Sequence, residues 1–206
     1  MLQPQHGAAS PTPGRLIVIN GTSSTGKSTL CTALQALLGE PYMVLGYDVM
    51  WMTMPARYFP FQPQEREGVW YELNPGDPTV ATGIGFGVVG RQAMTGLHHA
   101  VAALLACGLN VIVDVLFFEA ALYEEARRLW EPYRPLWVAL KPPLAVSERW
   151  EANREATRAG RPTGLARLGR EEIYAHSGFD LELDPSSGTP EDAARMVIAQ
   201  LSTSRP

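Results

Sequence analysis

The sequence LIVINGTSSTGKS, residues 16–28, decides the fold of this chain. Its first part, residues 16–19, is apolar and β-branched, which is typical of a short buried strand. A loop with glycines at Gly21 and Gly26 follows, and it leads into a helical pattern over residues 27–38 with apolar side chains on one face. A strand, a glycine-containing loop and a helix are therefore expected in direct succession.

The same alternation continues along the rest of the chain. Short apolar runs predict strands, and runs with a 3.6-residue period predict helices. The expected strands are residues 42–46, 109–116, 136–140 and 179–183, and the expected helices are residues 88–106, 119–130, 144–157, 168–176 and 190–201. Strands that alternate with helices predict a parallel sheet covered by helices on both faces. We therefore expect one α/β domain over residues 15–206, with a five-stranded parallel sheet in a three-layer sandwich.

Residues 48–87 do not follow this pattern. They are rich in proline, glycine and aromatic residues, and no period holds for long. We expect a short helix near residues 49–55 and then a long insertion over residues 57–86. A long loop in a compact domain is usually functional or disordered, and the many aromatic residues argue against disorder.

The composition excludes several classes of protein. A length of 206 residues fits one large domain, and the net charge of −4 gives no global electrostatic footprint for nucleic acid. The two cysteines, Cys31 and Cys107, are too few for a disulfide framework and are expected as small buried hydrophobic residues. No apolar run reaches the roughly 18 residues of a membrane helix. Residues 1–14 lack the regions of a signal peptide, so we expect a flexible leader and a cytoplasmic protein.

The loop after the first strand matches a known phosphate-binding pattern. Gly21–Ser28 has a glycine, four residues and then Gly-Lys-Ser, which is the P-loop, although a chance glycine turn is the alternative. Backbone N–H groups and the helix N-terminus can hold phosphate, Lys27 can reach the β- and γ-phosphates, and the Ser28 hydroxyl can ligate Mg²⁺. The expected nucleotide-binding residues are Gly21, Thr22, Ser23, Ser24, Thr25, Gly26, Lys27, Ser28 and Thr29.

Two acidic residues stand at the ends of expected strands. Asp114 ends the apolar strand of residues 109–116, where in P-loop proteins an acid faces the Mg²⁺ ion and its waters. Asp48 follows the strand of residues 42–46 and can orient an attacking hydroxyl and accept its proton. For both acids the alternative is a helix cap. We expect Ser28 and Asp114 at a metal site, and Asp48 and Lys27 as catalytic residues.

Residues 149–164 are rich in arginine and contain glycine near their end. Arginines stabilise the charge that spreads over the oxygens of a transferring phosphoryl group, and a closing loop also excludes water. The alternative is a solvated helix face with Glu–Arg pairs. We expect Arg158 and Arg161 to be catalytic, and we leave the roles of Arg149 and Arg154 open.

These motifs together resemble the chloramphenicol phosphotransferase family, whose members are small P-loop kinases similar in fold to shikimate and nucleoside monophosphate kinases. The resemblance covers nearly the whole chain after Gly14 and rests on residues 17–28, Gly46-Tyr-Asp48, the acidic strand end at residues 112–115 and the arginine loop at residues 158–161. It implies a P-loop NTPase fold with a mobile lid, and it implies that Asp48 is the base for the acceptor hydroxyl. The lid departs from the family pattern, since Ala-Gly stands where the family often has Gly-Asp.

The resemblance and the motifs together predict a reaction. ATP and R–OH, with Mg²⁺, would give ADP and R–O–phosphate, where R–OH is a small, partly apolar molecule such as chloramphenicol or a similar antibiotic. The acceptor-binding residues are expected to be Asp48, Met50, Trp51, Met54 and Asp114. The alternatives are a kinase of an ordinary metabolite or nucleotide, and a nucleotide-binding switch that has no acceptor. The expected partners are ATP and the acceptor, and the oligomeric state stays open.

Overall fold

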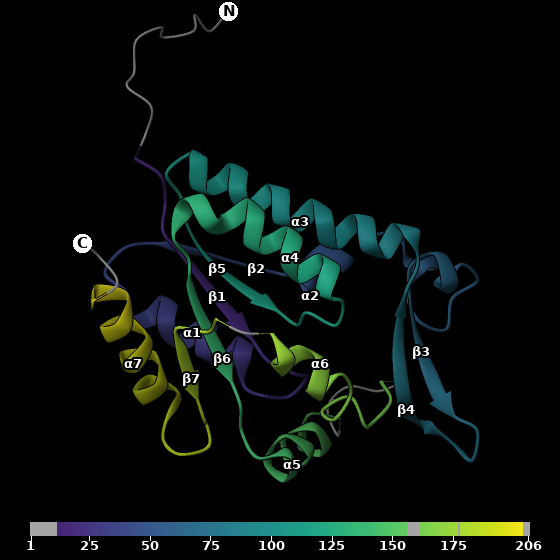
Figure 1. Ribbon diagram of the computed structural model, residues 1–206. Coiled ribbons are helices and arrows are strands. Elements are labelled where there is room, and N and C mark those ends of the chain that lie inside the picture. Colours follow the sequence, from purple (N-terminus) through teal and green to yellow (C-terminus); the bar gives the residue numbers. More distant parts are fainter. Residues whose placement is uncertain (1–11, 156–160, 177, 204–206) are drawn as a thin grey trace, which may run out of the picture.

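A parallel sheet forms the centre of the structure, a computed structural model that describes residues 12–155, 161–176 and 178–203 (Figure 1). The sheet confirms the predicted five parallel strands and has the order β2-β5-β1-β6-β7. Its strands are β1 (Leu16–Asn20), β2 (Tyr42–Gly46), β5 (Asn110–Val115), β6 (Leu136–Leu140) and β7 (Leu181–Leu183).

Helices cover both faces of this sheet, as predicted (Figure 1). One face packs against α3 (Val88–Ala106) and α4 (Ala120–Trp130), and the other against α1 (Lys27–Leu37) and α7 (Pro190–Thr203). The side chains of β1 alternate between the two apolar clusters, because successive residues of a strand point to opposite faces. Because both faces of the sheet are buried, the residues of β1 form the continuous apolar run seen in the sequence.

The parallel register brings the carboxyl ends of three strands to one edge. Gly46 pairs with Asp114, and Asn20 pairs with Val115. The phosphate loop leaves β1 at this edge, and the short helix α2 (Tyr47–Trp51) leaves β2 there. Ligands of open parallel sheets bind outside this edge, so the fold places the predicted site residues together.

The predicted long insertion has a structure of its own, which the sequence analysis missed. Strands β3 (Val69–Asn74) and β4 (Asp77–Phe86) form an antiparallel hairpin that stands apart from the central sheet (Figure 1). Register shifts around Leu73 break the two-residue alternation on which a strand prediction depends. Two 3₁₀ turns, Ala56–Tyr58 and Glu65–Glu67, precede the hairpin.

Several smaller expectations need correction. The helix predicted near residues 49–55 is α2, which begins earlier and ends at Trp51. Cys31 is buried as predicted, but Cys107 is exposed because it caps the end of α3. The predicted leader falls mostly outside the described residues, and the Gly14 N–H donates to Leu105 O at 2.8 Å. Within the described parts of the chain, no helix is both long and apolar enough to cross a membrane.

Candidate active site

The phosphate loop is held in shape by its own backbone and side chains. Ser24 has a φ of 58° and Gly26 a φ of 87°, so the loop turns through the left-handed region before α1 begins. A Cβ at Gly21 would lie 2.7 Å from Thr25 Oγ1, so only glycine fits there. Thr25 Oγ1 in turn donates to Thr22 O at 2.9 Å. These local contacts explain why the motif can be read from eight consecutive residues.

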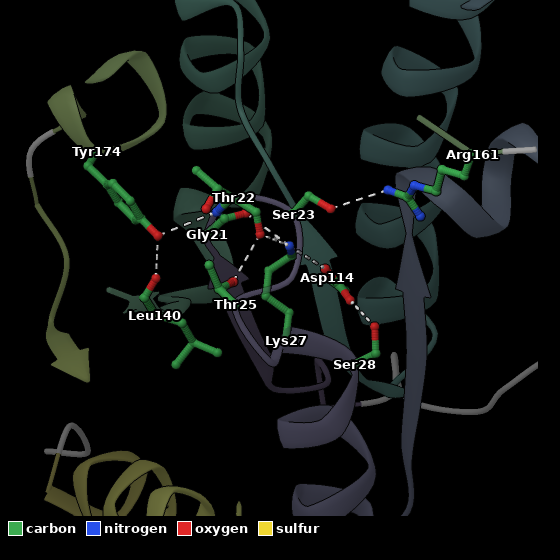
Figure 2. A network of polar contacts seen from close by, with 10 residues as sticks. All are labelled: Gly21, Thr22, Ser23, Thr25, Lys27, Ser28, Asp114, Leu140, Arg161 and Tyr174. Atoms are coloured by element: carbon green, nitrogen blue, oxygen red, sulfur yellow. Dashed lines mark hydrogen bonds and ion pairs between the residues drawn. The ribbon is translucent and has the colours of Figure 1, made fainter. Parts of the chain in front are cut away.

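Lys27 lies inside this loop with only 8% of its side chain exposed (Figure 2). Its Nζ donates to Gly21 O and Thr22 O, both at 2.9 Å, and lies 3.7 Å from Asp114 Oδ1. Carbonyl oxygens and a carboxylate therefore fix the ammonium group at the mouth of the loop. From there it can neutralise phosphate oxygens that the loop N–H groups bind.

Ser28 and Asp114 supply two adjacent oxygen atoms. Ser28 Oγ donates to Asp114 Oδ2 at 3.0 Å. Burial raises the pKa of Asp114, while Lys27 and the Ser28 hydroxyl lower it and the charge of Asp48 raises it further. Oxygen ligands suit Mg²⁺, which usually binds through one or two protein groups together with substrate phosphates. The Ser28 hydroxyl and the Asp114 carboxylate are oxygen donors of this kind. Among the described residues no group of three acidic, histidine or cysteine side chains lies close enough together to hold a metal ion.

Asp48 lies on the exposed first turn of α2, and the residues before it explain this position. The helix begins at Tyr47 with Gly46 at the N-cap, so the alternative role of Asp48 as the cap is wrong. Its carboxylate lines the same cavity as Lys27 and Asp114. The predicted acid at the end of β2 is thus placed beside the phosphate loop.

This cavity has a volume of about 710 Å³ and a mixed wall. One part carries the charged groups of the phosphate loop, Asp48, Asp114 and two arginines. The other part is apolar and aromatic, and it includes Trp51, Phe59, Val69, Tyr71, Ile84 and Phe118. A pocket of this size and composition suits a small organic molecule.

The residues of α2 and of the turn after it differ in whether they reach the cavity. Trp51, which also belongs to the core, and the C-cap Met52 line the cavity, whereas Met50 and Met54, both predicted to bind the acceptor, only pack against the core beside α3 and α4. Helical spacing explains the division, because Trp51 and Met52 follow Asp48 by three and four residues and so share its face. The prediction ignored this spacing and is corrected for Met50 and Met54.

The arginine-rich segment reaches the phosphate loop through Arg161. Its guanidinium donates to Ser23 Oγ at 3.2 Å, and Arg154 of helix α5 (Leu144–Glu155) lines the same cavity. Arg149 is exposed on that helix. Arg158 lies outside the described residues, so its predicted role stays a prediction.

Sequence reasoning missed two residues that hold the site together. Glu151 on α5 is only 5% exposed, and its carboxylate accepts the backbone N–H groups of Gly164 and Ala166, both at 2.9 Å. In the sequence it looks like one of several acids that pair with nearby arginines. Tyr174 on α6 (Arg170–Ala175) accepts the Thr22 N–H at 3.4 Å and donates to Leu140 O at 2.5 Å (Figure 2). Nothing near it in the sequence signals this contact.

Behind α2 lies a buried polar network, which we call the histidine network: Tyr47, His98 and Glu125. The Tyr47 hydroxyl lies 2.8 Å from His98 Nε2, and His98 Nδ1 lies 2.7 Å from Glu125 Oε2. His98 is fully buried, and burial lowers its pKa although Glu125 opposes this. A neutral ring satisfies both contacts when Nδ1–H donates to Glu125 and the Tyr47 hydroxyl donates to Nε2. The network anchors the helix that carries Asp48.

Comparisons with known proteins agree with this geometry. The sequence pattern of the family described as "Chloramphenicol phosphotransferase-like protein" matches residues 14–202. A "Putative O-phosphotransferase" from Mycobacterium tuberculosis strain H37Rv is 29% identical over 194 residues, which are 88% of this chain and 80% of that protein.

Solved structures of small P-loop kinases share the fold. The APS kinase of Mycobacterium tuberculosis, in complex with AMPPNP and APS, has a TM-score of 0.61 at 20% identity and covers 93% of this chain and 99% of its own. The shikimate kinase of Acinetobacter baumannii, in complex with shikimate, has a TM-score of 0.59 at 14% identity and covers 94% of this chain and 96% of its own. The predicted P-loop kinase fold is therefore confirmed.

Proposed function

Because this chain belongs to the chloramphenicol phosphotransferase-like family, we propose that it transfers the γ-phosphate of ATP to a hydroxyl group of a small, largely apolar molecule. The observation that carries this proposal is the mixed cavity. Asp48, Lys27 and Asp114 line it together with an apolar and aromatic wall. A nucleotide-binding switch would need no such wall.

The residues divide the work of the transfer. The loop N–H groups and Lys27 hold the β- and γ-phosphates, and Asp48 orients the acceptor hydroxyl and accepts its proton. The hydroxyl oxygen forms a bond to the γ-phosphorus, the bond from that phosphorus to the bridging oxygen breaks, and ADP leaves. Arg161 stabilises the charge on the transferring group. Ser28 and Asp114 would hold Mg²⁺, which supplies further neutralisation of the phosphate charge when it is bound.

The wall of the cavity narrows the class of acceptor. Trp51, Phe59 and Tyr71 offer large surfaces of low polarity, while the charged groups gather around the phosphate loop. We therefore propose chloramphenicol or a similar antibiotic as the first acceptor to test. A hydroxylated metabolite or a nucleotide is the second candidate, since the fold also occurs in an APS kinase and a shikimate kinase.

The proposal is tested by an ADP-release screen over hydroxylated compounds, followed by Asp48→Asn. This variant keeps the size of the side chain and removes its basicity. We expect calorimetry to show unchanged ATP binding, and acceptor phosphorylation to fall by roughly 10²–10⁴, the usual worth of a general base. Glu191→Gln removes an exposed acid on α7 and serves as the control. Equal turnover in Asp48→Asn and wild type would remove Asp48 from the chemistry.

A further inference from the structure

The β3–β4 hairpin is joined to the arginine-rich segment by backbone hydrogen bonds. The Thr163 N–H donates to Thr79 O at 2.8 Å, and the Ala81 N–H donates to Thr163 O at 2.8 Å. Val80 and Thr163 thereby form a parallel bridge. The edge of β4 thus pairs with the segment at Thr163 through an isolated bridge, in the manner of a strand that adds to a sheet edge.

Gly164 makes this close approach possible. Its φ is 88°, and a Cβ on it would lie 2.8 Å from Ala81 O. The Glu151 carboxylate on α5 accepts hydrogen bonds from the N–H groups of Gly164 and Ala166. The segment is therefore fixed between β4 and α5, and its position is set by both.

The two ends of the fixed segment have different tasks. Arg161, two residues before Thr163, donates to Ser23 of the phosphate loop. Leu165, two residues after Thr163, is buried in the wall of the cavity. The hairpin supplies Val69, Tyr71 and Ile84 to the same wall. One pair of strands thus contacts both the acceptor space and the segment that carries the arginine.

We propose that β4 is a positioning element for Arg161, and that it couples the arginine to the acceptor. An acceptor that packs against Tyr71 and Ile84 fixes the position of the hairpin. Because β4 pairs with Thr163, the position of the hairpin then determines that of Arg161. The arginine then meets the transferring phosphate when the hydroxyl is in place. This inference rests on the proposed function. Thr163 acts in it through its backbone, because its side chain is not part of the cavity wall.

Thr163→Pro tests the coupling because it removes the N–H that donates to Thr79 O. Thr163→Ala keeps both backbone hydrogen bonds, and both variants lose the hydrogen bond from Thr163 Oγ1 to Thr79 O at 3.4 Å, so Thr163→Ala is the matched control. We expect Thr163→Pro to lower kcat by about 10-fold to 10²-fold, as for a misplaced catalytic group, with calorimetric ATP binding unchanged. Thr163→Ala should stay close to wild type. If both variants match wild type, the pairing has no role in the reaction.

A double-mutant cycle separates positioning from a general structural defect. In an Arg161→Ala background, Thr163→Pro should cost less than about 2-fold further, because the residue through which it acts is already gone. An equal loss in both backgrounds would overturn the proposal. If Thr163→Pro fails to fold by circular dichroism, Gly164→Ala replaces it in the same cycle, since its Cβ would push against Ala81 O.

Two measurements allow this proposal and the proposed function to fail independently of each other. Hydrogen exchange of the Ala81 amide reports the pairing itself, and fast exchange in wild type would overturn it. If no hydroxyl compound is phosphorylated, the proposed function fails, and the same cycle is then measured on ATP hydrolysis, with water as the acceptor. Additive losses there would overturn the coupling as well.

Discussion

The phosphate side and the acceptor side of the cavity are built in different ways. The phosphate side is built mainly from eight consecutive residues, Gly21–Ser28, which bond to one another, and a few distant side chains such as Asp114 and Tyr174 add further contacts. The acceptor side combines α2, the β3–β4 hairpin and the segment around Leu165, which are far apart in the sequence. Most of the residues that bind phosphate are therefore neighbours in the sequence, whereas the residues that select the acceptor are brought together by long-range packing.

This division lets the two sides change separately. The apolar wall on the hairpin is linked to the phosphate loop only indirectly among the described residues, through the pairing at Thr163 and through Arg161, so the wall can change while the loop sequence stays the same. The histidine network shows the same division, because it anchors α2 from α3 and α4 rather than from α1. Substitutions on each side should therefore have separable effects on ATP binding and on acceptor binding.

The largest effect is expected on the phosphate side. Lys27→Met keeps most of the apolar stem and removes the charge, which leaves Asp114 without its cationic neighbour. We expect the rate of transfer to fall by at least about 10²–10³, the usual cost of losing a group that stabilises the transition state. Single-turnover rates with saturating ATP and Mg²⁺ measure this loss, and near-normal turnover would contradict the assignment of the loop.

The sequence analysis named most of the residues that the structure places around the phosphate loop, but only some of those that line the acceptor side. The loop, Lys27, Ser28 and Asp114 could be found because their spacing follows from a local backbone shape and from parallel register. The hairpin could not, because its pairing shifts register and its apolar side chains divide between the wall of a cavity and the core, as Val69, Ile84 and Phe86 show. The turn at Asn74-Pro-Gly-Asp77 was the signal that could have revealed it.

The roles of Glu151 and of the histidine network could not be predicted from the sequence for a related reason. Glu151 binds the backbone N–H groups of residues 164 and 166, and no pattern of side chains in the sequence predicts such a contact. His98 stands beside His99 in an apolar helix, and the partners that give it a role, Tyr47 and Glu125, come from other elements. A sequence shows which groups are costly to bury, but the partner of each is chosen by the fold.

A smaller effect is expected from the acceptor wall. Tyr71→Ala removes an aromatic surface from the cavity, while Tyr71→Phe keeps the ring and serves as the control. We expect Tyr71→Ala to raise the KM for the acceptor by about 10-fold, which corresponds to part of the burial energy of one aromatic side chain. The dissociation constant for ATP should not change. A weaker affinity for ATP in this variant would show that the two sides are not separable.

The smallest effect concerns the pH dependence of the histidine network. Burial lowers the pKa of His98 in the folded state, so the unfolded chain binds more protons just below the ordinary histidine pKa of about 6.5. Stability that is present above this pH is therefore lost as the pH falls towards the folded pKa, by up to about 1.4 kcal/mol per pH unit.

Urea unfolding at pH 7.5 and pH 5.5 measures this loss. His98→Gln offers a donor and an acceptor that do not titrate in this range, so the variant should lose less stability on acidification than wild type. His99→Ala removes the exposed neighbour, which contributes less than burial to the lowered pKa of His98, and it should keep most of the loss seen in wild type. Apart from residues 98 and 99 the three proteins have the same titratable groups, so only the difference between them reports on His98. Equal losses in wild type and His98→Gln would mean that the histidine network does not sense pH. The anchoring of α2, and with it the placement of Asp48, would then rest on packing alone.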